Sequence, residues 1–432
     1  MSSLSILHAA ARDTGKIIPK MQNKNRTSLK LAWCLTLSVL ATLSAQNVTI
    51  TDARIIGPKG NVIEHGSIVV RDGKIVSVVA GAPSSASGQV INATGMTAMP
   101  GFIDAHKHIN TGPNEKTYMQ SILEAGYTTV LAGGGPGDGT IALRDHIESG
   151  MIKGPRVIPS ERIDLRKTPE EAREAIRAMA AKGIKHTAEI ALGIPAPEPT
   201  PRDLEVLKAA VEEAAKVGVQ VNVHSVTTAA TLAGLDAGVR RFVHLPERDW
   251  TSHEAAARIA ATGSIVAGLN AFGAPIIDRL SGPSAPVQFP KDDTPRVRDG
   301  KPWPESIPAA MRDANGKAMG TEGGYTIVNA RTLWDADHNM LGFSTDQNYA
   351  DLVVLEHELK SFSIMFSMQD IFQIMGPNTA AYVGMGDQIG TIEPGKLADI
   401  ILLSGNPLEN IYGLLTTKVV IKGGKIVVDK RQ

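Results

Sequence analysis

The chain has 432 residues, of which 43% are hydrophobic and 20% are charged, so it holds enough apolar material for a large folded core. Lys plus Arg and Asp plus Glu number 44 each, a balance that gives neither a basic nucleic-acid-binding surface nor an acidic disordered tail. The composition therefore favours a small-molecule partner and excludes no enzyme class.

Residues 1–45 have the features of an N-terminal extension that ends in a signal peptide. Basic residues between positions 24 and 30 precede the apolar run LAWCLTLSVLATL, which the small pair Ser44-Ala45 follows. This order is typical of secretory signals, and the run is too short for an ordinary membrane span. We expect a periplasmic or secreted protein, with Met21 as an alternative start and no stable membrane insertion after processing. A buried first helix or an uncleaved anchor is the alternative.

The only cysteine, Cys34, lies inside that apolar run. A processed chain would therefore contain no cysteine, which excludes disulfides, thiolate nucleophiles and cysteine-based zinc sites. Any metal ion must be bound by histidine and carboxylate side chains.

Residues 46–98 and 390–432 have the pattern of β-strands joined by tight turns. Alternating β-branched residues surround the turn Asp72-Gly73, and the stretch KVVIKGGKIVV has Gly423-Gly424 at its turn. Two β-rich ends around a different middle predict one small β-sandwich module built from both ends of the chain.

Residues 99–389 alternate short apolar runs with helix-like segments such as TPEEAREAIRAMAAKG and TPRDLEVLKAAVEEAAKVG. Strand–helix alternation of this kind predicts an α/β fold, and eight strands predict a closed (β/α)8 barrel of the TIM type. The eight candidate strands are GFIDAHKH, YTTVLAG, RVIPS, KHTAEIA, VQVNVHS, RFVHLP, SIVAGLN and LGFSTD.

Two segments of this middle region depart from the alternation. Residues 281–325 are rich in Pro, Gly and charge, which predicts a lid-like insertion at the rim of the barrel. Gly133-Gly134-Gly135 follows the second strand, but it lacks the GxGxxG spacing of a dinucleotide-binding turn. We interpret the triplet as a loop.

His106 and His108 flank Lys107 at the end of the first candidate strand. Residues i and i+2 of a β-strand point to the same face, so both imidazoles project to one side and can share an ion. HxH triplets also occur by chance, and a polar loop is the alternative interpretation.

Three later strands carry a polar residue at one common spacing. A glycine lies six residues before each of Glu189, His224 and His244. If each glycine ends a helix in the left-handed conformation, the three side chains reach the same height at the carboxyl ends of successive strands. Such residues are costly to bury unpaired, so packing alone does not explain them.

Asp346 in the last strand completes a set of four histidines, one Glu and one Asp, all at predicted strand ends. Zinc, manganese and iron suit this mixture of nitrogen and oxygen ligands. The set predicts a metal site formed by His106, His108, Glu189, His224, His244 and Asp346.

The sequence resembles the metal-dependent amidohydrolase superfamily, in its imidazolonepropionase-like and enamidase-like branch. MPGFIDAHKHI resembles the first-strand motif of that superfamily, and VNVHS, RFVHLP and FSTD resemble its motifs on strands five, six and eight. GTIEPGKLADIILLSGNPLENI resembles the segment that returns the chain to the β-module. The resemblance extends from residue 48 to the end.

The resemblance implies two divalent metal ions, most commonly Zn²⁺, with Fe²⁺ or Mn²⁺ as alternatives. One ion would lie on His106, His108 and Asp346, and the other on His224 and His244. Many relatives bridge the ions with a carboxylated lysine in a GxDxIK pattern, which is missing here. We therefore expect Glu189 to be the bridge, with a modified Lys185 as the alternative.

The expected function is a binuclear hydrolase that cleaves an amide, lactam or related C–N bond through a metal-bridging hydroxide. Asp346 is the expected catalytic residue, which accepts the proton of the water and passes it to the leaving group. An esterase, lactonase or deaminase on the same scaffold, or a non-catalytic metal-binding protein, is the alternative. The sequence does not identify the substrate, and it is compatible with a homo-oligomer.

Overall fold

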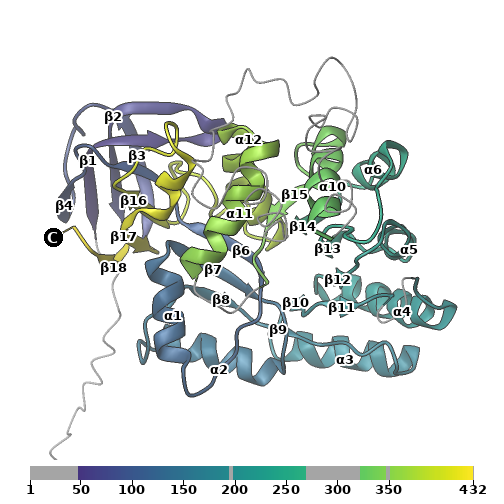
Figure 1. Cartoon of the computed structure of the whole chain (residues 1–432). Coiled ribbons are helices and arrows are strands. Elements are labelled where there is room, and N and C mark those ends of the chain that lie inside the picture. Colours follow the sequence, from purple (N-terminus) through teal and green to yellow (C-terminus); the bar gives the residue numbers. More distant parts are fainter. Residues whose placement is uncertain (1–46, 194–197, 269–321, 347–350, 432) are drawn as a thin grey trace, which may run out of the picture. The chain divides into compact units, whose positions relative to one another are not determined.

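The structure is a computed structural model, and it describes residues 47–193, 198–268, 322–346 and 351–431 (Figure 1). The predicted signal peptide and residues 281–321 of the predicted insertion lie outside the described residues. The insertion was expected to reach residue 325, but helix α10 already begins at Glu322. The described residues form an α/β fold with parallel strands, as the alternation of strands and helices predicts.

The two ends of the chain meet in one eight-stranded sheet of order β18-β17-β16-β5-β1-β2-β3, with β4 paired to β1. Asp72 and Gly73, and Gly423 and Gly424, have positive φ, as the tight turns of their hairpins require. The sheet contains β1 (Val48–Ile56), β2 (Val62–Arg71), β3 (Lys74–Ala80), β4 (Gln89–Asn92), β5 (Thr97–Pro100), β16 (Ile400–Leu403), β17 (Thr417–Lys422) and β18 (Lys425–Asp429). The sandwich form and the boundaries of a separate module stay predictions.

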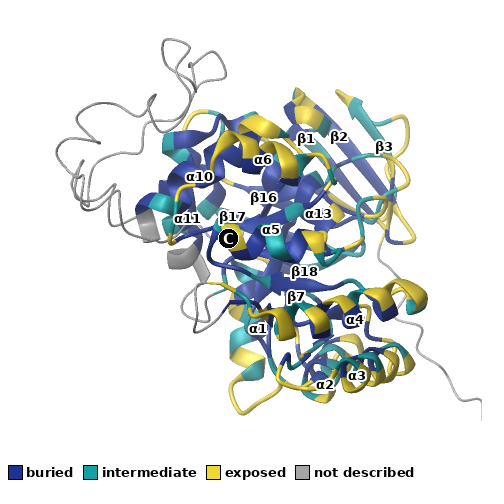
Figure 2. Cartoon of the chain, turned by 90° about the vertical axis from the view of Figure 1, so that its right-hand side faces the viewer, coloured by how far each residue is buried: buried dark blue, intermediate teal, exposed yellow. Residues whose placement is uncertain are grey.

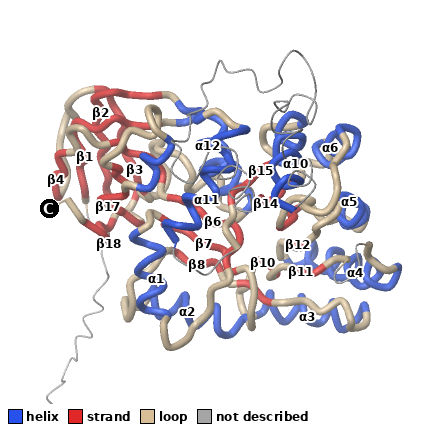
Figure 3. Tube along the Cα trace, in the orientation of Figure 1, coloured by secondary structure: helices blue, strands red, loops and turns tan. Residues whose placement is uncertain are grey.

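The middle of the chain supplies parallel strands at all eight predicted positions (Figure 3). They are β6 (Phe102–Lys107), β7 (Tyr127–Ala132), β8 (Arg156–Ile158), β9 (Ser160–Glu161), β10 (His186–Thr187), β11 (Ile190–Ala191), β12 (Asn222–His224), β13 (Arg241–Val243), β14 (Ile265–Gly268) and β15 (Leu341–Phe343). Two predicted strands are interrupted, so that β8 and β9 together, and β10 and β11 together, fill one predicted position each.

These strands lie in three sheets, β6-β7-β8, β9-β10 and β11-β12-β13-β14-β15, and not in one closed barrel. Isolated parallel bridges link His186 to Gln220 and Lys107 to Asp346. The ladder breaks at Glu189 because its amide donates to the carbonyl oxygen of Gly133 at 3.1 Å instead of continuing the pairing of β10. Parallel strands are therefore shown, while the closure of the sheet stays a prediction.

Helices follow the strands and cover them. Their bounds are α1 (Glu115–Glu124), α2 (Gly137–Glu148), α3 (Pro169–Ala181), α4 (Pro201–Val217), α5 (Thr228–Asp236), α6 (His253–Ala260), α10 (Glu322–Ala336), α11 (Asp351–Met365), α12 (Met368–Gln373) and α13 (Thr379–Tyr382). Short helical turns add η1 (Pro58–Gly60), η4 (Ile374–Asn378) and η5 (Ile411–Leu415). The side chain of Thr168 caps α3 and that of Thr200 caps α4, each in a reciprocal capping box.

The helices bury one face and expose the other, as α3 and α4 show in Figure 2. Apolar side chains of the strands and the inner helix faces form one large core, and the eight-stranded sheet has a smaller core of its own. Among the described residues, no helix combines the length and the apolar character needed to cross a membrane.

Candidate metal centre

His106 and His108 lie together at the carboxyl end of β6. Their ring centroids are 5.1 Å apart, with the rings nearly perpendicular. The side chain of His106 is 2% exposed, whereas that of His108 is 36% exposed. The structure therefore places one imidazole inside the protein and one at its surface, on the same side of the chain, as the strand parity predicts.

Glu189 lies between two pairs of imidazoles. The break between β10 and β11 turns its side chain toward the ends of β6, β12 and β13. The Glu189 carboxylate lies 2.7 Å from Nδ1 of His224, 3.2 Å from Nε2 of His108, 3.6 Å from Nε2 of His106 and 3.7 Å from Nε2 of His244. One carboxylate therefore contacts all four predicted histidines.

Asp346 adds a second carboxylate on the side of the first histidine pair. Its Oδ1 atom lies 2.9 Å from Nε2 of His108 and 3.1 Å from Nε2 of His106. The backbone of Asp346 has a φ of 57°, in the left-handed region that residues other than glycine rarely adopt. His244 has a φ of 69°, so two of the six side chains leave their strands at an unusual backbone angle.

The common spacing brings Glu189, His224 and His244 together, although not at one height. The three glycines that precede them have positive φ, as expected. The strand pairing places His224 level with Ala191 of β11 and with Val243 of β13. Glu189 precedes Ala191 by two residues and therefore lies below His224. His244 follows Val243 by one residue and therefore lies above His224. The break before β11 and the positive φ of His244 compensate for the difference.

The six side chains offer ligand atoms close enough together for metal ions. Three groups each have their ligand atoms within 4.8 Å of one another: His106, His108 and Glu189; His106, His244 and Asp346; and Glu189, His224 and His244. Imidazole nitrogens and carboxylate oxygens are ligands that zinc, manganese and iron accept. The buried Nδ1 atom of His244 also lacks a hydrogen-bond partner among the described residues. The donor set fits divalent cations, and Nε2 of His244 is the nitrogen that faces Glu189.

The electrostatics of the centre favour positive charge between the two carboxylates. Burial acts to raise the pKa of Glu189, but its contacts with His108, His224 and His244 outweigh burial and lower the pKa. Burial also acts to raise the pKa of Asp346, but its hydrogen bonds with His106 and His108 outweigh burial and lower that pKa. Asp346 and then Glu189 raise the pKa of His108 to about 10. Cations can replace the protons that such a cluster attracts.

A buried network connects β6 to the segment that carries Asp346. The Asp104 carboxylate accepts hydrogen bonds from the His106 amide at 3.1 Å and from the Thr345 amide and hydroxyl at 3.1 and 2.6 Å. Lys107 donates from Nζ to the Thr345 hydroxyl at 2.9 Å. Asp104 therefore stabilises the loop, and Lys107 points away from the six-residue cluster.

Sequence reasoning missed the part that Gly133 and Gly134 take in this centre. A Cβ atom on Gly133 would lie 2.5 Å from Cε1 of His106, and one on Gly134 would lie 2.7 Å from Cε1 of His108. Only glycine leaves room for both rings at this approach. The sequence did hold one indication of this role. The triplet Gly133-Gly134-Gly135 directly follows β7, the strand that pairs with β6.

Lys185, the alternative bridging residue, lies just before β10 and is exposed. The strand is interrupted at residues 188 and 189, between Lys185 and the point where β11 begins. His186 is buried, with Nε2 3.2 Å from the carbonyl oxygen of Val383. The structure therefore brings Glu189, and not Lys185, to the four histidines.

A hollow of about 1030 Å³ opens beside the centre, and Glu189, His224, Arg162 and Arg166 are among its lining residues. It gives a small molecule access to Glu189 and His224. The hollow lies at the carboxyl ends of the parallel strands, where ligand sites of such folds occur.

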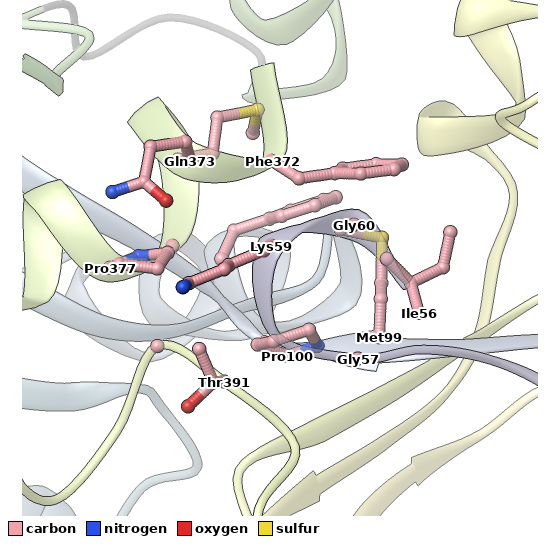
Figure 4. A pocket seen from close by; sticks show the side chains of 15 residues that line it. Ile56, Gly57, Lys59, Gly60, Met99, Pro100, Phe372, Gln373, Pro377 and Thr391 are labelled. Atoms are coloured by element: carbon pink, nitrogen blue, oxygen red, sulfur yellow. The ribbon is translucent and has the colours of Figure 1, made fainter. Parts of the chain in front are cut away.

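A second, much narrower pocket lies between the eight-stranded sheet and α12 (Figure 4). Ile56, Met99, Pro100 and Phe372 give it a largely apolar wall, with Lys59 at its edge. It reaches Gly101 and Phe102 at the start of β6, whereas His106 and His108 lie at the other end. The reactive side chains therefore lie at the first hollow.

The model of the amidohydrolase family matches residues 97–260 and 321–427, which is more than half of the chain. An imidazolonepropionase from Caldanaerobacter subterraneus subsp. tengcongensis is 22% identical over 425 residues, covering 85% of this chain and 91% of that protein. An enamidase from Eubacterium barkeri is 34% identical over 85 residues, covering 18% of this chain and 22% of that protein.

Solved structures show the same fold. The crystal structure of A. niger ochratoxinase matches with a TM-score of 0.68 at 18% identity, covering 90% of this chain and 97% of that protein. At this identity the likeness concerns the fold alone.

Proposed function

The chain belongs to the amidohydrolase family, whose members are hydrolases of carbon–nitrogen bonds, and we propose that it cleaves an amide, lactam or related bond with two divalent metal ions. One observation carries this proposal. The Glu189 carboxylate lies between the pair His106 and His108 and the pair His224 and His244. A single carboxylate between two imidazole pairs is the arrangement that two ions sharing one ligand require.

We assign His106, His108 and Asp346 to one ion, His224 and His244 to the other, and Glu189 to both. The short contacts of Asp346 with the first pair support this division. His106, His244 and Asp346 also form a compact group, so His244 lies near both positions. Zn²⁺ suits the ligands best, with Fe²⁺ and Mn²⁺ as alternatives.

In this proposal the metal ions and Asp346 have different roles in catalysis. Divalent ions in such a site supply Lewis acidity, which polarises a carbonyl group and acidifies water. Asp346 is held ionised by His106 and His108, and it lies at the mouth of the centre with 22% of its side chain exposed. Its carboxylate accepts a proton from the attacking water and delivers it to the leaving nitrogen.

Surrounding residues keep this arrangement rigid. Gly133 and Gly134 let the backbone close over the first two imidazoles, and this limits the access of water to them from that side. Asp104 fixes the backbone of His106 and Thr345, and thereby the position of the neighbouring Asp346. Preorganised ligands of this kind lower the cost of reaching the reactive geometry.

Metal analysis joined to a hydrolysis screen tests the proposal. The purified protein should contain about two divalent ions per chain, and metal-stripped protein should lose its activity on amides and lactams. Glu189→Ala should lower the metal content, whereas His65→Ala, which alters an exposed histidine of the eight-stranded sheet, should not. A Glu189→Ala protein that keeps two tightly bound ions would refute the bridging role.

We also propose that the parallel strands form a closed (β/α)8 barrel beside a β-sandwich module. The bridge between Lys107 and Asp346 supports closure, because it joins β6 to the residues that follow β15. The bridge between His186 and Gln220 likewise supports continuity across the break in β10 and β11. A crystal structure in which these strand pairs stay separate would contradict the barrel.

We propose, finally, that residues 1–45 direct export to the periplasm or the medium. The basic segment and the apolar run that follows it support this proposal. Fractionation of expressing cells and N-terminal sequencing of the product test it. An uncleaved cytoplasmic product would overturn it.

A further inference from the structure

Arg162 follows β9 directly and lines the hollow beside the metal centre. Its Nη2 atom lies 3.3 Å from the point that a Cβ atom on Gly134 would occupy, and Cε1 of His108 lies 2.7 Å from the same point. The guanidinium group and the exposed imidazole of the centre are therefore neighbours. The side chain of Arg162 is exposed, so a molecule in the hollow can contact it.

Arg162 differs from the other arginine of the hollow in its partners. Arg166 binds Asp164, with Nη2 2.8 Å from Oδ2, and its hydrogen bonds lower the pKa of Asp164 to about 2. Within the described part of the chain, no ion pair or hydrogen bond joins the Arg162 guanidinium to a carboxylate. Arg162 therefore keeps its full set of donors for a ligand.

The acidic residues of the hollow are already engaged. Asp203 completes the capping box of α4 by accepting from the amide and hydroxyl of Thr200 at 3.0 and 2.7 Å. Asp164 is bonded to Arg166, and Glu189 to the histidines. None of these carboxylates is bonded to Arg162 among the described residues, so its guanidinium donors are available to an anionic group of a bound molecule.

We propose that Arg162 binds a carboxylate of the substrate, and that the substrate class is the N-acyl amino acids, dipeptides included. This inference rests on the function proposed above. A planar guanidinium binds a carboxylate through two parallel hydrogen bonds. In an N-acyl amino acid the carboxylate is separated from the scissile nitrogen by one carbon atom, a short span that matches the proximity of Arg162 to His108.

Pairs of acids and amides test the proposal with the metal-loaded enzyme. N-acetyl-L-phenylalanine, N-acetyl-L-methionine and N-acetylglycine are each compared with their carboxamides, and the acetate released is measured. The acids should be cleaved with the higher kcat/KM. Arg162→Gln should reduce kcat/KM for the acids by about 10- to 100-fold, mainly through KM, and leave the carboxamides unchanged.

Two further variants separate binding from general charge effects. Arg162→Lys should restore part of the preference for acids, because it keeps the charge and loses the paired donors. Arg166→Gln should leave the preference intact, because this arginine is already bonded to Asp164. Equal losses in Arg162→Gln and Arg166→Gln would contradict the assignment.

A binding measurement keeps the inference distinct from the proposed function. Levulinate has CH₂ in place of the NH of N-acetylglycine, so it is not hydrolysed. Calorimetry should show that the enzyme binds levulinate more tightly than levulinamide, and that Arg162→Gln removes the difference. Hydrolysis of carboxamides and acids at equal rates, with equal binding of the two probes, would overturn the role of Arg162 while leaving C–N hydrolysis in place. Failure to cleave any amide or lactam with both ions bound would instead refute the proposed function.

Discussion

The backbone amide of Asp346 donates to the carbonyl oxygen of His106 at 2.8 Å, although 240 positions separate the two residues. This bond joins the segment after β15 to the end of β6, and it directs the Asp346 side chain toward Nε2 of His106. Because the bond uses only backbone atoms, a change of the Asp346 side chain can remove the carboxylate and keep the segment in place.

Asp346→Asn should therefore inactivate the enzyme without unfolding it. The amide side chain has the same shape but cannot take up a proton, so kcat should fall by about 100-fold or more. Measurements of kcat, metal content and thermal unfolding check this expectation. Asp387→Asn, at an exposed position away from the centre, is the control. An Asp346→Asn enzyme with unaltered kcat would remove Asp346 from the proton transfer.

Gly133→Ala should damage the centre by steric overlap. The added methyl group would lie 2.5 Å from Cε1 of His106, whose ring is buried and has no room to move. We expect a loss of about 1–3 kcal/mol in the free energy of unfolding, together with weaker metal binding. Chemical denaturation and metal titration measure the two effects.

Gly112→Ala is a suitable control for this substitution. Gly112 lies in the loop that follows β6, and a Cβ atom there would meet no atom within 4 Å. The control should match the unmodified protein in metal content and activity. If Gly133→Ala also matches the unmodified protein in metal content and activity, the close approach of Gly133 to His106 is not needed for function.

Asp104→Asn should destabilise the fold more than a typical surface substitution. Asp104 and Lys107 are both fully buried, and their opposite charges attract each other. Asparagine weakens this attraction and removes the carboxylate oxygen that accepts from the Thr345 hydroxyl, at a cost of about 1–3 kcal/mol. Urea denaturation of metal-stripped protein measures the change in the free energy of unfolding.

The double variant Asp104→Asn, Lys107→Met tests the cause of that loss. If the lost attraction between the two charges is responsible, the double variant should be more stable than the sum of the two single changes predicts. Strict additivity would show that Asp104 acts through its hydrogen bonds with His106 and Thr345 alone.

Much of the centre follows from local regularities of the sequence. The two-residue period of a β-strand places His106 and His108 on one side, and this needs no knowledge of the rest of the chain. The left-handed glycines before Glu189, His224 and His244 fix where each strand begins after its helix. These two patterns predict five of the six side chains that meet, and the end of the last predicted strand supplies Asp346.

Other features depend on contacts between distant segments, which local patterns do not contain. The amide of Glu189 bonds to the carbonyl oxygen of Gly133, and this interrupts the strand that the sequence predicts to be continuous. The positive φ of His244 is stabilised by a hydrogen bond from its amide to Ala267 on the next strand. Neither bond can be foreseen from the residues next to it in the chain.

His186 should make the stability of the protein depend on pH. Burial, and then the positive charge of Arg241, lower the pKa of His186 to about 3. The unfolded chain has the ordinary value of about 6.5, so between these two values it binds a proton that the folded protein does not. The contribution of His186 to stability is therefore complete above pH 6.5 and decreases as the pH falls toward 3.

The variant His186→Gln isolates this effect, because the glutamine amide nitrogen reaches about as far as the imidazole Nε2 and can still donate to the carbonyl oxygen of Val383. The free energy of unfolding of the metal-stripped protein, relative to the variant, should decrease by about 1 kcal/mol per pH unit below pH 6. Metal-stripped protein is required because metal binding is itself pH-dependent and would add to the free energy of unfolding. A difference between the two proteins that stays constant from pH 7 to pH 5 would show that His186 is protonated in the folded state, and that burial does not dominate its pKa.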